Sequence, residues 1–208
     1  MAFSRLCGVT QYSYYMVDIM QNTDISETIS AKWASVGVTI FEMVGSLLAI
    51  ILCDRFGRRK LLMSSGIGMF VSNTSLFLHQ CYLRNQTEGL SLNNSLPILA
   101  LSLFYVSFTL GFGGLPFVIL GEMFPPGRQK SMAVSLSVSC IWILNFINTK
   151  SYFVVVESPV IGYQGLFLGN GLFCLLATIV VFCCLPETKK KTLAQVQEAF
   201  KEFRLMGH

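Results

Sequence analysis

Charge is scarce in this sequence. Of its 208 residues only 12% are Asp, Glu, Lys or Arg, whereas 53% are hydrophobic, and the mean hydropathy is +0.60. A soluble domain carries roughly 25% charged residues, so this composition indicates a surface that faces lipid. The net charge of +4 does not indicate nucleic-acid binding, because the basic residues cluster at the ends of apolar segments and not along one face.

Histidine and paired cysteines are also rare. The chain has two histidines, His79 and His208, and seven cysteines without any C-x-x-C spacing. Most of the cysteines lie within apolar runs, where cysteine packs as a small hydrophobic residue. The sequence also lacks a Ser/His/Asp set, a zinc-ligand spacing and a phosphate-binding loop. We therefore expect no enzyme activity, no metal and no cofactor.

Long apolar runs are what the sequence has in their place. A helix needs about 20 residues to cross a bilayer, and six candidate spans approach or exceed this length: 3–20, 34–53, 61–82, 97–124, 131–156 and 163–185. The first is the weakest, because it carries Arg5, Gln11 and Asp18. The pattern predicts an all-α integral membrane protein, with a six-helix bundle at 1–188 and a tail at 189–208 that contains a short amphipathic helix.

Basic residues and glycosylation sequons predict the orientation. Nine Lys and Arg residues follow the second, fourth and sixth spans, whereas only Lys32, Arg84 and Lys150 lie near the opposite ends. The polar connector after the third span holds sequons at Asn85 and Asn93, which act only on the outer side. Both patterns place the C-terminus in the cytoplasm, and we expect the protein in the plasma membrane.

Glu42 lies deep within the second span. It precedes Asp54 by 12 residues, which is about 18 Å along a helix and close to the middle of the hydrocarbon core. An unpaired charge at this depth costs about 3 kcal/mol on insertion scales, so an intramembrane carboxylate is a candidate functional residue. The small residues Gly45, Ser46 and Ala49 follow on the same helix face and place Glu42 toward the bundle interior. A protonated, hydrogen-bonded packing residue is the alternative.

Two further spans carry polar patches. Trp142 and Asn145 lie one turn apart in the fifth span and offer an aromatic face beside an amide. This pair suits a ligand with apolar faces and a hydroxylated rim, as a sugar has; helix packing is the alternative. Thr10, Gln11 and Tyr14 form a comparable patch in the first span.

The fourth span contains three glycines around one proline, in Gly111-Phe112-Gly113-Gly114-Leu115-Pro116-Phe117. Glycine weakens a helix, and proline removes a backbone hydrogen bond and kinks it. Broken helices at membrane depth are tolerated where they line a cavity or act as a gate. We predict a moving gate here, with a static kink as the alternative.

Three motifs together resemble the sugar porter branch of the major facilitator superfamily, the glucose-transporter-like proteins. Asp54-Arg55-Phe56-Gly57-Arg58-Arg59 is similar to the family's D/E-R-x-G-R-R loop after helix eight, Gly121-Glu122-Met123-Phe124-Pro125 to the segment that closes helix ten, and Pro186-Glu187-Thr188-Lys189 to the signature after helix twelve. The match covers helices seven to twelve, the C-terminal half of that fold. The resemblance implies a half-bundle that pairs with an N-terminal half around a central sugar site.

The resemblance also implies residue roles. Glutamates near the arginines at the inner helix ends would pair only while those ends stay together, which favours an outward-facing state. The expected cytoplasmic charge network is Asp54, Arg55, Gly57, Arg58, Arg59, Glu122, Arg128 and Glu187. The expected substrate-binding residues are Thr10, Gln11, Tyr14, Glu42, Trp142 and Asn145, and the expected gating residues are Tyr14, Tyr15, Gly113, Gly114, Pro116 and Phe117.

The chain departs from the family pattern at several of these positions. The glutamine pair of helix seven is Ser4-Arg5, an asparagine of helix eight is Glu42, and Thr109 stands where many members have a glutamate. Losing both glutamines removes up to four donors and two carbonyl acceptors from a hydroxyl-reading site. We therefore expect weak recognition of glucose itself.

Three functions remain open at this point. The chain is the C-terminal half, or a truncated form, of a hexose or polyol facilitator that works by alternating access; or it is a proton-coupled symporter that uses Glu42; or it is a non-transporting sensor or inactive fragment, because six helices supply only half of a central cavity. The short segment before the first span favours truncation. The expected partners are the sugar, the lipid bilayer and an N-terminal six-helix half, and no nucleic acid.

Overall fold

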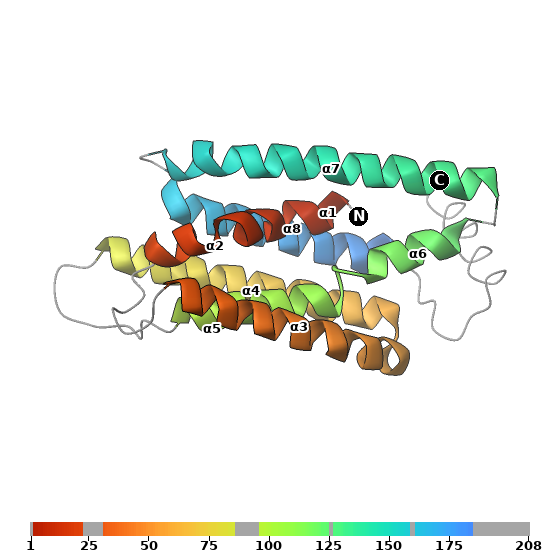
Figure 1. Cartoon of the computed structure of the whole chain (residues 1–208), viewed down its shortest axis with the longest axis horizontal. Coiled ribbons are helices and arrows are strands. Elements are labelled where there is room, and N and C mark those ends of the chain that lie inside the picture. The colour runs from red at the N-terminus through yellow and green to blue at the C-terminus, as the bar shows by residue number, and fades with distance from the viewer. Residues whose placement is uncertain (1, 23–30, 86–95, 125–126, 159–160, 185–208) are drawn as a thin grey trace.

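The computed structural model describes residues 2–22, 31–85, 96–124, 127–158 and 161–184. Within these ranges every regular element is a helix (Figure 1). The helices are α1 (Ala2–Leu6), α2 (Val9–Asn22), α3 (Ala31–Phe56), α4 (Arg58–Asn85), α5 (Leu96–Leu110), α6 (Leu115–Met123), α7 (Arg128–Val156) and α8 (Gly162–Cys184).

Five stretches are long and apolar enough to cross a membrane, at Lys32–Cys53, Arg58–Arg84, Leu96–Gly121, Arg128–Val156 and Gly162–Cys183. The predicted all-helical membrane fold is confirmed, and these five stretches coincide with the second to sixth predicted spans. The first predicted span, at 3–20, is divided between α1 and α2, and each piece is shorter than a single span.

The long helices lie side by side along one axis, with α1 and α2 set between α7 and α3 (Figure 1). α4 packs against both α5 and α8, and α3 packs against α5. The core is apolar and aromatic, and the ring of Tyr12 on α2 meets that of Phe104 on α5 edge-on at 4.8 Å between centroids. In the apolar stretches of α3 and α7, only 11% of the residues are buried inside the protein, whereas 44% are buried in α4. α3 and α7 therefore expose more of their apolar residues than α4 does.

The division between α1 and α2 occurs at Gly8. Its φ is +90°, a conformation that an L side chain rarely adopts, and a Cβ there would overlap the side-chain amide of Asn170 on α8. Glycine therefore serves twice, by turning the chain and by letting its backbone approach α8. A second departure follows at Tyr15, where φ is −113° and ψ is 20° inside α2.

The predicted interruption of the fourth span lies between α5 and α6. Four residues, 111–114, form turns, and Pro116 stands in the first turn of α6, where a missing N–H costs little. The N–H of Gly113 bonds back to the carbonyl of Phe108 at 2.8 Å, which closes the end of α5.

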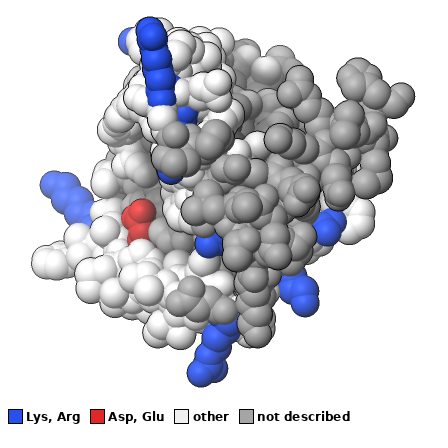
Figure 2. Space-filling view, turned by 90° about the vertical axis from the view of Figure 1, so that its right-hand side faces the viewer, with Lys and Arg blue, Asp and Glu red and all other residues white. Residues whose placement is uncertain are grey.

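Basic side chains gather at one end of the bundle. Figure 2 shows Lys and Arg side chains projecting around the end where α3 and α6 finish and α4 and α7 begin. Arg55, Arg58, Lys60 and Arg128 lie there, in keeping with the charge pattern from which we predicted the cytoplasmic side. That this end faces the cytoplasm remains a prediction.

We expect Gly8→Ala to lower the melting temperature of the purified protein in detergent. A side chain in the left-handed region costs about 1–2 kcal/mol, and the overlap with Asn170 adds to it. Gly37→Ala is the matched control, because a Cβ at Gly37 in α3 meets no atom within 4 Å; it should be neutral or slightly stabilising. Equal melting temperatures for the two variants would contradict this account of the break.

Candidate functional site

Polar side chains converge where α2 meets α7. Thr10 Oγ1 donates a hydrogen bond to Asn145 Oδ1 at 2.8 Å, so two predicted substrate-binding residues that are 135 positions apart in the sequence touch. This bond fixes the amide of Asn145, whose Nδ2 donor group has no acceptor among the described residues. One turn earlier on α7, Trp142 is 65% exposed. The arrangement presents an open indole face beside an oriented amide donor.

Gln11 lies behind this surface, in the core. Its Nε2 donates to the backbone carbonyl of Asn148 at 2.8 Å and to Ser151 Oγ at 3.4 Å, and its Oε1 accepts from Asn170 Nδ2 at 3.0 Å. Only 2% of the residue is exposed. These side-chain hydrogen bonds join α2 to α7 and α8, so Gln11 supports the site from within, and its contact with a substrate remains a prediction.

A buried amide network continues from Gln11. Asn170 Nδ2 also donates to the hydroxyl of Tyr12 at 3.2 Å, and that hydroxyl donates to Asn73 Oδ1. Asn73 Nδ2 donates to the carbonyl of Met69 at 2.9 Å. The sequence analysis did not select Tyr12, Asn73 or Asn170 as site residues. The available signal was an amide in the middle of an apolar span, since such a group must find a partner inside the protein.

Glu42 is half-buried on α3, near the contact with α5. Of the small residues that follow it, Gly45 packs closely on α5, where a Cβ would overlap Thr109 Oγ1, whereas Ser46 is exposed. The phenol of Tyr105 on α5 lies within electrostatic range of the Glu42 carboxylate, and its oxygen is 3.0 Å from Ser13 Oγ on α2. Glu42 is thus at the edge of the polar surface shared by α2, α3 and α5.

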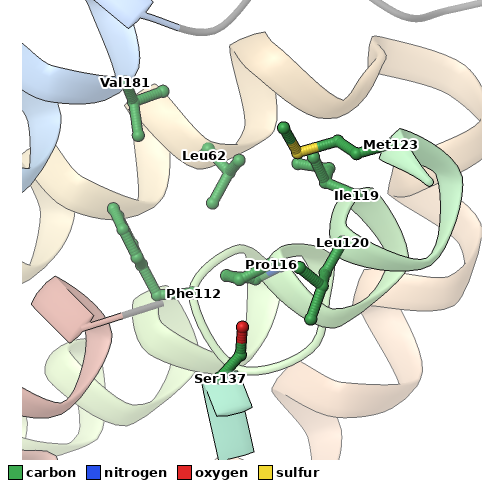
Figure 3. Close-up of a pocket in the computed structure, with 8 residues that line it drawn as sticks. All are labelled: Leu62, Phe112, Pro116, Ile119, Leu120, Met123, Ser137 and Val181. Carbon is green, nitrogen blue, oxygen red and sulfur yellow. The ribbon is translucent and has the colours of Figure 1, made fainter. Parts of the chain in front are cut away.

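Two cavities flank the interruption between α5 and α6, each of about 330 Å³. Figure 3 shows the side chains of the first pointing into a common space, with Pro116 and Phe112 from the break region, Ser137 from α7 and Val181 from α8. Gly113 and Gly114 line the second. Both linings are mostly apolar, and among the described residues no group of three His, Cys, Asp or Glu side chains could hold a metal.

The predicted aromatic gate residues on α2 differ in their surroundings. Tyr14 is 68% exposed. Tyr15 is half-buried, and its ring stacks on Tyr152 of α7 with 4.0 Å between centroids and 10° between planes. Phe117, the fourth gate residue near the α5–α6 break, is 39% exposed.

At the basic end, Arg59 joins α4 to α8. Its Nη2 donates to the carbonyl of Phe182 at 2.6 Å, and its guanidinium carbon lies 5.5 Å from the centre of the Phe182 ring. Phe182 O is among the last carbonyls of α8, where a cation is favourable. Gly57, with φ of +85°, turns the chain between α3 and α4 so that Arg59 can reach α8.

Several predicted residues fall outside the described part of the structure. These are the side chains of Asp54, Asn85 and Glu122, and the residues Asn93 and Glu187. The predicted pairing of glutamates with Arg58, Arg59 and Arg128, and both glycosylation sites, therefore remain predictions. The same holds for the short helix expected in the tail at 189–208.

Sequence comparison gives a family match over nearly the whole chain. The model of the family described as "Sugar (and other) transporter" matches residues 1–200. Among curated proteins, the facilitated trehalose transporter Tret1 of Anopheles gambiae is 30% identical over 197 residues, which is 95% of this chain and 24% of that protein. The protein of the same name from Culex quinquefasciatus is also 30% identical, over 95% of this chain and 37% of its own length. The chain thus spans well under half of these relatives.

Solved structures of a membrane symporter share the fold. The proton:xylose symporter XylE, bound to 6-bromo-6-deoxy-D-glucose, superimposes with a TM-score of 0.78 at 22% identity, over 96% of this chain and 41% of that one. XylE of E. coli in its inward-open conformation gives a TM-score of 0.74, over 95% and 39%. At this identity the likeness speaks for the arrangement of the helices alone.

We expect Gln11→Leu to lower the melting temperature, because it removes the three side-chain hydrogen bonds that join Gln11 to α7 and α8. Each hydrogen bond that is lost costs about 0.5–1.5 kcal/mol. Gln129→Leu, at an exposed position at the start of α7, makes the same chemical change and should stay within about 0.5 kcal/mol of the parent. If the two variants melt alike, Gln11 does not hold the three helices together.

Proposed function

The chain belongs to the sugar transporter family, and on that premise we propose that it forms the C-terminal half of a carrier that moves a hexose or related polyol across a membrane by alternating access. The observation that carries the proposal is the Thr10–Asn145 hydrogen bond beside the exposed Trp142. The family is one of transporters and not of enzymes. We propose the plasma membrane as the location, with the basic end of the bundle and the C-terminus in the cytoplasm.

The chemistry of this surface suits a sugar. A pyranose ring has apolar C–H faces that pack on an indole and a rim of hydroxyl groups that need donors and acceptors. Trp142 supplies the flat apolar face, and Asn145 supplies an amide whose orientation Thr10 fixes at 2.8 Å. Because the amide is already held, less conformational entropy is lost when a hydroxyl binds to it.

The open surfaces of α3 and α7 support the proposal that a second six-helix half packs against them. Both helices are apolar, both are only 11% covered, and both carry candidate site residues, Glu42 and Trp142. A second six-helix half placed against them would enclose the site from the other side. This half would come from the same longer chain or from a partner.

The α5–α6 interruption is the element we propose to move. α6 is nine residues long and begins after a run of turns, and cavities of about 330 Å³ adjoin the interruption. A short helix beside unfilled space can pivot at its glycines if its buried side chains, Leu115 and Ile119, repack into that space. We propose that Gly113, Gly114, Pro116 and Phe117 form one gate of the site and that Tyr14 and Tyr15 form another.

A single-tryptophan protein tests the site directly. The chain has two tryptophans, and the other one, Trp33, lies in the first turn of α3 and is 73% exposed. In Trp33→Phe only Trp142 emits. We expect its fluorescence to change when a sugar that binds is added, because the sugar ring stacks on the indole of Trp142. Trehalose, hexoses and polyols form the set to be screened.

Trp142→Phe is the matched control for this titration, since only Trp33 then emits and no change is expected. Trp142→Ala should weaken sugar binding and uptake into vesicles about three- to ten-fold, the value of one aromatic contact, while Trp33→Ala keeps both. A sugar that is taken up without any response from Trp142 would contradict its place in the site.

Glu42 favours a second candidate function, proton-coupled symport, because it is a half-buried carboxylate within a membrane span. For facilitated diffusion we expect sugar uptake into vesicles to be the same with and without an inward proton gradient. Glu42→Gln, which keeps the shape and removes the charge, should then stay within about two-fold of the parent. Uptake that accelerates with the gradient, and loses this acceleration in Glu42→Gln, would instead establish symport.

A further inference from the structure

One carboxylate joins three helices at the end of α2 that is away from Gly8. Asp18 Oδ2 accepts a hydrogen bond from the hydroxyl of Tyr152 on α7 at 2.6 Å and another from the hydroxyl of Tyr163 on α8 at 3.0 Å. A hydroxyl that donates to an ionised carboxylate forms a stronger bond than a neutral pair does. This group was not selected from the sequence, where Asp18 only weakened the first predicted span.

Tyr152 links this carboxylate to the aromatic gate. Its side chain is completely buried, and its ring carries Tyr15 in a nearly parallel stack at 4.0 Å. Phe153 meets both rings edge-on, at 5.1 Å from Tyr15 and 5.5 Å from Tyr152. α2 therefore holds one tyrosine at two points, by its ring through Tyr15 and by its hydroxyl through Asp18.

The backbone of α2 is kinked at the first of these two contacts, Tyr15. Tyr15 and Asp18 are three residues apart and lie on one side of a helix, but the backbone at Tyr15 is not helical, with φ of −113° and ψ of 20°. The segment that follows this kink is thus not held in line by α2 alone. Its direction depends on the buried side chains of Met16, Ile19 and Met20 and on the contacts that Asp18 and Tyr15 make with α7 and α8.

We propose that Asp18 is a positioning residue for the proposed sugar site: through Tyr152 it fixes the ring of Tyr15 and the direction of α2 beyond its kink. The inference rests on the proposed function, because Tyr15 matters to transport only if it closes over a bound sugar. We call the hydrogen bond between Asp18 and Tyr152 the anchor. It would affect the binding of the sugar, before the opposite gate opens. Without it, the closed arrangement of Tyr15 is less populated, and the apparent affinity falls by the same factor.

The test compares Tyr152→Phe with Tyr163→Phe in sugar uptake by protein in lipid vesicles. Each variant removes one hydroxyl from the same carboxylate oxygen, but only Tyr152 carries the ring of Tyr15. We expect Tyr152→Phe and Asp18→Asn to raise KM about three- to ten-fold with kcat within about two-fold of the parent. Tyr163→Phe should leave KM within about two-fold.

The double variant Asp18→Asn with Tyr152→Phe separates one shared interaction from two independent ones. If both residues act through a single hydrogen bond, the double variant has the KM of either single variant; independent effects would multiply. Multiplying effects, or equal KM values for Tyr152→Phe and Tyr163→Phe, would overturn the proposal. Should Tyr152→Phe fail to fold, Asp18→Asn against Tyr163→Phe makes the same comparison.

Backbone hydrogen exchange at residues 16–21 keeps this inference distinct from transport itself. We expect faster exchange there in Tyr152→Phe than in Tyr163→Phe, because Tyr152 contacts the segment at both Asp18 and Tyr15 and makes the shorter hydrogen bond to Asp18. If the parent protein takes up no sugar but the exchange rates differ in this way, the proposed function fails and the anchor remains. If sugar is taken up and the exchange rates do not differ, the anchor fails and the proposed function remains.

Discussion

A polar side chain within hydrocarbon has to find its partner inside the protein, because no water reaches it. In this chain the partners lie where α2 meets α7 and α8. Gln11 bonds to Asn148 and Ser151 on α7 and accepts from Asn170 on α8, and Asn170 extends the chain of bonds to Tyr12 and then Asn73 on α4. Four helices are thereby placed relative to one another by side-chain hydrogen bonds, which are directional in a way that apolar packing is not.

The interruption at Gly8 and the interruption between α5 and α6 differ in how closely the neighbouring side chains pack around them. The break at Gly8 is filled, since the amide of Asn170 occupies the space that a Cβ would need. The break between α5 and α6 is flanked by cavities, and α6 contacts few of its neighbours. The buried network therefore makes the part of α2 around Gln11 and Tyr12 the fixed side of the polar surface, whereas the α5–α6 region has room to change. A site that binds and releases needs both kinds of element.

The sequence analysis recovered the helices better than the site. Runs of apolar residues and the loop around Gly57 were enough to predict the five long stretches and the interruption near Pro116, because hydrophobic length and helix breakers are local properties. Thr10 and Asn145 were each selected, but their contact spans 135 residues of sequence and depends on how α2 meets α7. Gln11 shows the limit most clearly: its type suits a ligand, and only the packing of α8 reveals that its amide faces inward.

The distribution of open surface says why the site residues belong on these helices. Asn145 and Trp142 share α7 with Asn148 and Tyr152, whose side chains turn toward α1 and α2. One face of α7 is thus held by hydrogen bonds to α1 and α2, and the other leaves Trp142 uncovered. A helix anchored on one face keeps the residues of its other face in a constant orientation. A site that recognises a sugar has to match the directions of its hydroxyl groups as well as their number. Side chains that are already ordered in the folded protein lose little conformational entropy when the sugar binds. A fixed orientation therefore contributes more to recognition than additional contacts would.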